Sequence, residues 1–355
     1  MRLFLFSICL LLLVITGCGS DSSSAPTNQQ PVVDDEQPDI DDDDDGEQPD
    51  AADNDITDAI FTRREGSCAD YASMYVSDVM DVQRGTSFAG DLTITLSGGT
   101  CMFKTNAIPN HDFNDGGSFA TVVSAQNVSY EMTATPAIAG GATELILGDD
   151  AIFLNGVKLD LLAAACYDVG NEPLGREKIG CGPDQNDNPW RYDPMSTLNE
   201  FGTDRNNAHT QPDGTYHYHG DPMAMFSGDC AGATAASPVI GFAGDGFPIF
   251  GSCIDDGGSV RRALSSYILK DNDGPRQEVA GYTTPEGGRG SVASSNYDGQ
   301  FRGDYEYSEG AGDLDECNGM VVDGQYGYVV TNSYPWVLGC FKGTPDDSFY
   351  RLGPP

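Results

Sequence analysis

Apolar and polar residues alternate in several short segments of this chain, which is the pattern of a strand with one buried face. The alternation is clearest at 92–96, where leucine and isoleucine alternate with threonine. A hairpin is predicted at 151–159, because Asn155-Gly156 separates two apolar runs and favours the positive φ angles of a type I′ turn. Further short strands are predicted at 144–147, 239–242 and 326–331.

Helical patterns are scarce by comparison. The best candidate is 68–82, where Tyr71, Met74 and Val79 could share one face, and 159–166 is a second, shorter one. The chain contains 44 glycines, and turn signals are frequent. We therefore expect a mainly β fold, a disulfide-stapled β-sandwich or distorted barrel with few short helices.

The N-terminal residues have the pattern of an export signal. Arg2 precedes an apolar run from Leu3 to Ile15, which is too short to cross a bilayer core of about 30 Å. The run ends in Ile15-Thr16-Gly17-Cys18, which resembles the lipobox of bacterial lipoproteins. The resemblance implies a signal peptide over 1–17, a lipid anchor at Cys18 that holds the protein to the membrane, and a place in the bacterial cell envelope, periplasmic or at the outer-membrane surface. An ordinary secretory signal with a chance cysteine is the alternative.

The composition changes after Cys18. Residues 18–60 are rich in Ser, Gln, Pro and Asp, with an unbroken acidic run at Asp41–Asp45, so we expect a disordered acidic tether. A weak cation-binding segment is the alternative. We expect one globular domain over 61–355. The formal net charge of the chain is −37, which argues against nucleic acid as a partner.

The cysteine content agrees with export. Without Cys9 in the signal peptide and Cys18, eight cysteines remain, an even number that predicts four disulfides in an oxidising compartment. About a hundred pairings are possible, and we expect neighbours in sequence to pair. No CxxC spacing occurs, so a cysteine zinc site is not indicated. The eight are Cys68, Cys101, Cys166, Cys181, Cys230, Cys253, Cys317 and Cys340.

Three of the four histidines lie within eleven residues. Pro212-Asp213-Gly214 is a turn signal, and a three-residue hairpin loop at this point would pair His209 with His217. His219 is two residues further along the strand and points to the same side. The spacing therefore predicts that three imidazoles converge on one face, as ligands of copper or zinc.

The fourth histidine, His111, lies in a predicted loop at 106–112. Loops held by a rigid sheet often complete sites, so we predict that His111 joins the cluster. Two alternatives remain. His111 could be exposed or hydrogen-bonded elsewhere, and the other three histidines could form a structural network or a metal-free pocket.

Tyr216-His217-Tyr218-His219 resembles the tetrad of the YHYH-domain proteins. The stretches 207–215, 245–251 and 108–111 also resemble elements of that family, as do Asp315–Gly319 and Tyr334–Trp336, so the likeness extends roughly from Thr93 to Gly343. The segment 161–167 departs from the family pattern. The resemblance implies no established reaction. It suggests that Asp245 orients a histidine, and we assign Tyr216 and Tyr218 to the same supporting role behind the ligands.

Two other features of the sequence bear on its chemistry. The segment 184–188 is rich in oxygen ligands and could hold calcium, but it lacks the EF-hand glycine and distal glutamate, so a solvated turn is expected. No established catalytic motif, such as G-x-S-x-G or H-E-x-x-H, occurs.

The first functional hypothesis is an exported lipoprotein that binds a divalent metal. The second is a metal-dependent extracytoplasmic enzyme, a hydrolase or copper oxidoreductase of unknown substrate, with Trp190, Tyr192 and the two tyrosines of the tetrad lining a pocket. The third is a metal-free surface-interaction or carbohydrate-binding module.

Overall fold

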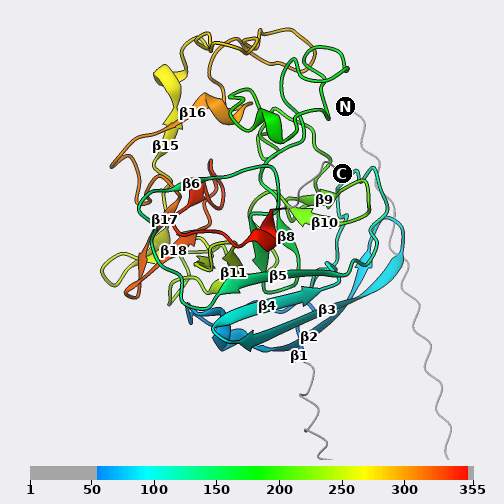
Figure 1. Cartoon of the computed structure of the whole chain (residues 1–355), viewed down its shortest axis with the longest axis vertical. Coiled ribbons are helices and arrows are strands. Elements are labelled where there is room, and N and C mark those ends of the chain that lie inside the picture. Colours follow the sequence, from blue (N-terminus) through cyan, green and yellow to red (C-terminus); the bar gives the residue numbers. More distant parts are fainter. Residues whose placement is uncertain (1–53, 351–355) are drawn as a thin grey trace, which may run out of the picture. The chain divides into compact units, whose positions relative to one another are not determined.

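The computed structural model describes residues 54–350, and its architecture is mainly β, as predicted (Figure 1). The first sheet contains β1 (Asn54–Asp55), β2 (Ser73–Asp81), β3 (Thr86–Ser97), β4 (Thr100–Thr105) and β5 (Val128–Thr133), in that order. The second has the order β17 (Gly319–Val322), β18 (Gln325–Val329), β12 (Pro248–Phe250), β11 (Val239–Ala243), β7 (Ala151–Phe153), β8 (Lys158–Leu159), β10 (Tyr216–Tyr218) and β9 (Ala208–Thr210).

Three small pairs of strands complete the described region: β13 (Cys253–Asp255) with β14 (Val260–Arg262), β15 (Tyr267–Leu269) with β16 (Tyr305–Tyr307), and β19 (Cys340–Phe341) with β6 (Thr143–Glu144). The helices are single 3₁₀ turns: η1 (Cys68–Tyr71), η2 (Pro183–Gln185), η3 (Lys270–Asp273), η4 (Arg302–Asp304) and η5 (Asp347–Phe349). None of these turns has the length or apolar run that crossing a bilayer would require.

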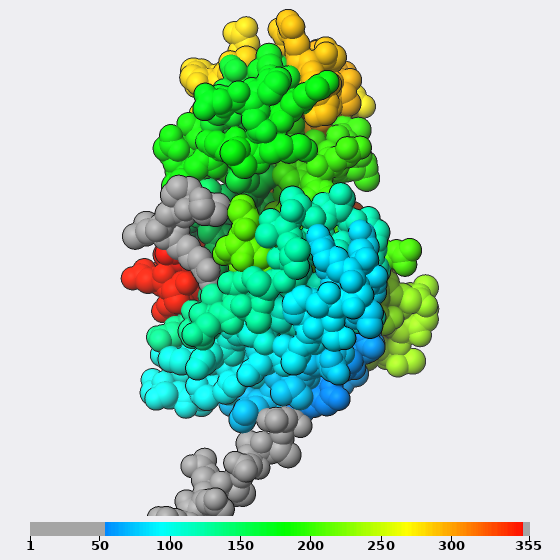
Figure 2. All heavy atoms as spheres, turned by 90° about the vertical axis from the view of Figure 1, so that its right-hand side faces the viewer, coloured from blue at the N-terminus to red at the C-terminus, as the bar shows by residue number. Residues whose placement is uncertain are grey.

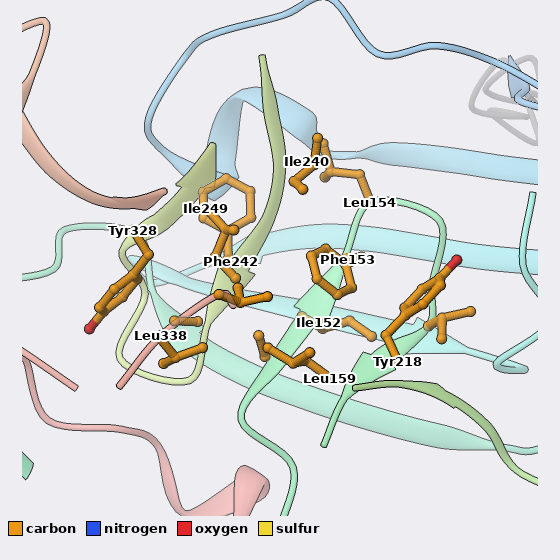
Figure 3. Close-up of a cluster of buried hydrophobic side chains, with 14 of the residues drawn as sticks. Ile152, Phe153, Leu154, Leu159, Tyr218, Ile240, Phe242, Ile249, Tyr328 and Leu338 are labelled. Carbon is orange, nitrogen blue, oxygen red and sulfur yellow. The ribbon is translucent and has the colours of Figure 1, made fainter. Parts of the chain in front are cut away.

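The two main sheets pack face to face. Phe103 of β4 contacts Phe242 of β11 with ring centroids 6.1 Å apart, and Phe242 also meets Tyr71 at 5.6 Å. Figure 3 shows apolar side chains from neighbouring strands of the eight-stranded sheet gathered in this core, among them Phe153, Leu159 and Phe242. Neither sheet closes on itself within residues 54–350, so the sandwich prediction fits and the barrel alternative does not.

The predicted helix at 68–82 is wrong. Only η1 is helical there, and β2 pairs with β3 along its whole length. Ser77, Val79 and Asp81 are buried, whereas Asp78 and Met80 between them are exposed, which is the period-two alternation of a strand. The spacing of the apolar residues fits the period of a helix as well as that of a strand. Hydrogen bonding to β3 favours the strand.

The second predicted helix, at 159–166, is also absent. The backbone carbonyls there bond to distant segments rather than within a helical turn: Ala163 accepts from the Arg191 guanidinium, Ala164 from the Cys181 amide, and Ala165 from the Tyr192 amide. These bonds hold the segment in an extended, irregular path next to β8.

The predicted hairpin at 151–159 is confirmed. Ala151 of β7 pairs with Leu159 of β8 in antiparallel register. The turn differs in detail, because Gly156 has φ +82° whereas Asn155 keeps a negative φ, and the Gly156 amide donates to the Phe153 carbonyl. The loop is therefore not the two-residue type I′ turn that was expected.

The four predicted disulfides form between sequence neighbours, as expected. They are Cys68–Cys101, Cys166–Cys181, Cys230–Cys253 and Cys317–Cys340. The first joins η1 to the start of β4 and so links the N-terminal turn to the first sheet.

The predicted domain boundary at residue 60 falls inside the first sheet. Asn54 and Asp55 of β1 pair in parallel with β2, and the amide of the buried Ile56 donates to the Val76 carbonyl. Regular structure thus starts before residue 61. The predictions for the signal peptide, for Cys18 and for the acidic run concern residues outside the described range.

The contact of Phe242 with both sheets predicts that Phe242→Ala destabilises the domain by roughly 3–5 kcal/mol, because it leaves a cavity between the sheets. Val321 is 62% exposed on β17, so Val321→Ala should change the free energy of unfolding by no more than about 0.5 kcal/mol. Guanidinium unfolding with the disulfides intact measures both. Equal effects of the two substitutions would contradict the assigned packing.

Candidate metal centre

The hairpin of β9 and β10 has the predicted register. His217 lies opposite His209, Tyr216 opposite Thr210, and Tyr218 opposite Ala208. Gly214 has φ +88°, and its amide donates to the Gln211 carbonyl, which closes the loop that Pro212 begins. Because this pairing is antiparallel, His209 and His217 point to the same side of the sheet.

The three imidazoles meet through their Nε2 atoms. The Nε2 atoms of His217 and His219 are 3.1 Å apart, and those of His219 and His209 are 3.0 Å apart. Within residues 54–350, these histidines form the one group of three or more His, Cys, Asp or Glu whose ligand atoms all lie within 4.8 Å of one another. His217 and His219 are buried, and His209 is partly exposed.

The other ring nitrogens identify the tautomers. His209 Nδ1 lies 2.6 Å from the Phe201 carbonyl oxygen, and His217 Nδ1 lies 3.3 Å from that of Thr215. A carbonyl oxygen can only accept, so each of these Nδ1 atoms carries the proton of the neutral ring. The Nε2 atoms of His209 and His217 therefore present lone pairs to His219.

The three Nε2 atoms have one proton too few to be joined by two hydrogen bonds. His219 Nε2 lies between two lone pairs and can donate a single proton to one of them. At least one contact of about 3 Å between nitrogens is therefore left without a hydrogen. A cation that accepts all three lone pairs resolves the repulsion, and backbone carbonyls that hold Nδ1–H are the usual support of metal-ligating histidines.

Protonation of the rings is disfavoured. Burial, followed by the neighbouring His219 and His209, lowers the pKa of His217 well below its usual value. Burial also lowers the pKa of His219 well below its usual value, and it lowers that of His209. All three imidazoles are therefore neutral at pH 7, the form in which histidine binds metals.

His111 does not join the cluster, so that prediction is wrong. It lies on the opposite face of β10, where its Nε2 is 2.7 Å from the Tyr218 hydroxyl and its Nδ1 is 2.8 Å from the Asp112 carbonyl oxygen. The ring of His111 also packs against Tyr216. His111 follows β4 of the first sheet, and that sheet packs on the tyrosine side of the hairpin.

Tyr216 and Tyr218 point away from the histidines, into the core. The Tyr216 hydroxyl donates to Asp204, and the Tyr218 hydroxyl accepts from Asn155 Nδ2. Both side chains are fully buried and pack on the opposite face of β10, so they do not contact the imidazoles of the site.

Asp245 also lies away from the histidines, contrary to the role suggested for it. Its carboxylate accepts from the Tyr328 hydroxyl at 2.6 Å and from the Gly343 amide at 2.9 Å. It stabilises the turn between β11 and β12, where Gly246 has φ +85°.

The oxygen-rich segment at 184–188 is a hydrogen-bonded turn. Asn186 Oδ1 accepts from the Leu147 amide, and Asn188 Oδ1 accepts from the Trp190 amide. These side-chain oxygens serve the fold, and no metal-like cluster of acidic groups forms in this part of the described chain.

The three histidines line a cavity of about 710 Å³. Ser118, Ala120, Lys178 and Ile179 also line it. In Figure 2 the surface is hollowed between the upper green part and the cyan part below it. The tetrad tyrosines, Trp190 and Tyr192 do not line it, because all four are buried in the core. In the part of the chain that the structure describes, these four residues therefore do not form the predicted aromatic lining of this cavity.

Sequence reasoning missed a polar group in this cavity. β8 pairs in parallel with β10, with Lys158 opposite His217, which brings Lys158 and Asp160 to the histidine side. Lys158 Nζ donates to Asp149 and to Gln211, and Gln211 Nε2 donates to Asp160 at 2.9 Å. Burial raises the pKa of Asp160 to about 7. No sequence motif marks this group, since it depends on the pairing of strands distant in sequence.

The family model described as YHYH protein matches residues 129–343. The match contains all three clustered histidines and every strand of the eight-stranded sheet, whereas His111 and β1–β4 precede it. No curated protein and no solved structure matches the chain. Since the family model covers more than half of the sequence, the chain belongs to the YHYH protein family.

Proposed function

We propose that this protein is an exported, lipid-anchored lipoprotein that binds one divalent metal ion, copper or zinc, through His209, His217 and His219. The observation that carries the proposal is the convergence of three neutral Nε2 atoms with one proton too few to bond them to one another. Three imidazoles and an open side toward a cavity are the donor set of many zinc and copper sites.

The spacing supports an ion of this size. Metal–nitrogen bonds of about 2.0–2.1 Å in a tetrahedral site separate the nitrogens by roughly 3.3 Å. The Nε2 atom of His219 lies 3.1 Å from that of His217 and 3.0 Å from that of His209, close to this separation, and the ligand atoms of all three histidines lie within 4.8 Å of one another. Imidazole suits both metals, and copper has the higher intrinsic affinity.

Three observations support the proposed location in the cell envelope. They are the lipobox-like Ile15–Cys18, the four disulfides, which are typical of oxidising compartments, and the acidic segment after Cys18. The acidic charge disfavours nucleic acid as a partner.

A metal-dependent enzyme is the second candidate, and the cavity favours it. Catalytic zinc sites commonly use three protein ligands and keep one position for water or substrate. Here the histidines border a cavity large enough for a small molecule, which a purely structural site does not need. A metal-free interaction module is less well supported, because it would not require the three imidazoles to converge.

His217→Ala should abolish stoichiometric metal binding, because it removes one of only three ligands. His111→Gln should retain it, because His111 lies on the other face of the strand. Elemental analysis of untagged protein after equilibration with Zn²⁺ or Cu²⁺, followed by gel filtration, measures both variants. Metal retained by His217→Ala, or lost by His111→Gln in folded protein, would oppose the assigned ligand set.

Metal affinity should persist to lower pH than in a free peptide of residues 206–220. Histidine in such a peptide has a pKa of about 6.5, so protons compete with the metal below that pH. Burial lowers the pKa of all three site histidines in the protein, which moves this competition to lower pH. Chelator competition at pH 5 to 8 compares the two. The idea fails if the protein loses metal at the same pH as the peptide.

Cys18→Ser should release the protein from the membrane fraction. The substitution removes the thiol that carries the lipid in lipoproteins with this signal. Labelling with a radioactive fatty acid, together with fractionation of the expressing bacterium, tests it. Cys9→Ser, within the signal peptide, is the matched control and should leave the anchor in place; an unlabelled wild-type chain would refute the lipidation.

A further inference from the structure

The cavity beside the histidines has the dimensions and walls of a small-molecule site. Its volume of about 710 Å³ lies within the usual range of ligand pockets, roughly 300–1,000 Å³. Much of its wall is apolar, so the body of a ligand that fits it would also be apolar. The apolar lining residues include Leu147, Leu162, Ala163, Ala164, Phe201 and Pro212.

One acceptor in the lining is left unused. The Asp160 carboxylate accepts a hydrogen bond from Gln211 Nε2 on Oδ2, and its Oδ1 is buried without a hydrogen-bond partner. Asp160 itself is only 8% exposed. A carboxylate can accept about four hydrogen bonds, so a buried one with a single donor leaves capacity for a hydrogen bond from a ligand in the cavity.

The charged residues of the lining favour a ligand that donates a hydrogen bond over an anionic ligand. Its two cations are Lys158 and Lys178. Lys158 is paired with Asp149, and Lys178 Nζ donates to the Glu200 carbonyl. Neither forms an ion pair with Asp160. An anionic ligand would therefore meet an acidic group that has no ion-pair partner among these two cations, whereas a hydroxyl or amine could donate to its unbonded oxygen.

We propose that this cavity binds a small organic molecule that has an apolar body and donates a hydrogen bond, through a hydroxyl or an amine, to Asp160. The proposed metal site borders the same cavity, and the pairing of β8 with β10 places Asp160 next to His219. The inference therefore rests on and deepens the proposed function, because the small molecule would bind beside the metal. The donor contact with Asp160 does not itself require the metal.

Three probes that differ at one group test this proposal: 2-phenylethanol, 2-phenylethylamine and the methyl ether of 2-phenylethanol, which has no donor. Binding to the whole protein is measured by calorimetry and ligand-observed NMR, in metal-free and Zn²⁺-loaded samples. The alcohol or the amine should bind the metal-free protein at least about tenfold more tightly than the ether, the loss expected for one hydrogen bond to a buried charged group. The relative affinity of the alcohol and the amine shows which of the two groups the site prefers. The proposal is supported whether the alcohol or the amine binds more tightly.

Asp160→Asn should remove this advantage, because its amide can turn an N–H toward the donor. Asp184→Asn, in the exposed turn of η2, is the matched control and should bind the probes like the unmodified protein. Ala164 is half-buried and lines the cavity, so Ala164→Phe fills part of the cavity and should weaken the binding of all three probes. This variant tests the binding site even if Asp160→Asn does not fold.

The outcomes separate this inference from the metal site. Metal binding without binding of any probe, or equal binding of alcohol, amine and ether with no effect of Asp160→Asn, overturns the inference and leaves the metal site intact. Donor-selective probe binding by a protein that takes up no metal supports the inference and overturns the metal proposal instead.

Discussion

The functional account depends on one constraint, the antiparallel register that places His209 opposite His217. Residues on a strand alternate between the two faces, so this register and the position of His219 put three imidazoles on one side and two tyrosines on the other. A slip of one residue would exchange the faces and bury the imidazoles in the apolar core. The turn at Pro212–Gly214 and the packing of the tyrosines both hold the register in place.

The two faces of the hairpin have different hydrogen-bonding environments. On the core side, Tyr218 is held by His111 and Asn155, and Tyr216 is held by Asp204, so every polar group on the tetrad tyrosines has a partner. On the cavity side, carbonyl oxygens accept from the Nδ1 atoms of His209 and His217, and the three Nε2 atoms face one another with one proton too few to bond them all. One face of this short strand thus packs into the core, and the proposed metal site lies on the other.

Features that depend on local chemistry could be predicted from the sequence, and features that depend on long-range packing could not. The Pro212–Gly214 turn fixes its hairpin over a few residues, so the convergence of the histidines was predictable. His111 was misplaced because a loop pattern does not say on which side of the sheet the loop passes. The apolar residues of β2 fit the period of a helix as well as that of a strand, and only its pairing with β3 distinguishes the two. Lys158 and Asp160 meet the site only through the parallel pairing of β8 with β10.

Diffraction from crystals of untagged, metal-equilibrated protein, recorded on both sides of the zinc and copper absorption edges, tests the central claim most directly. The account predicts one anomalous peak bonded to the Nε2 atoms of residues 209, 217 and 219 at about 2.0–2.1 Å. An ordered cluster of the same three imidazoles with no anomalous signal, or a metal bound to other side chains, would contradict it.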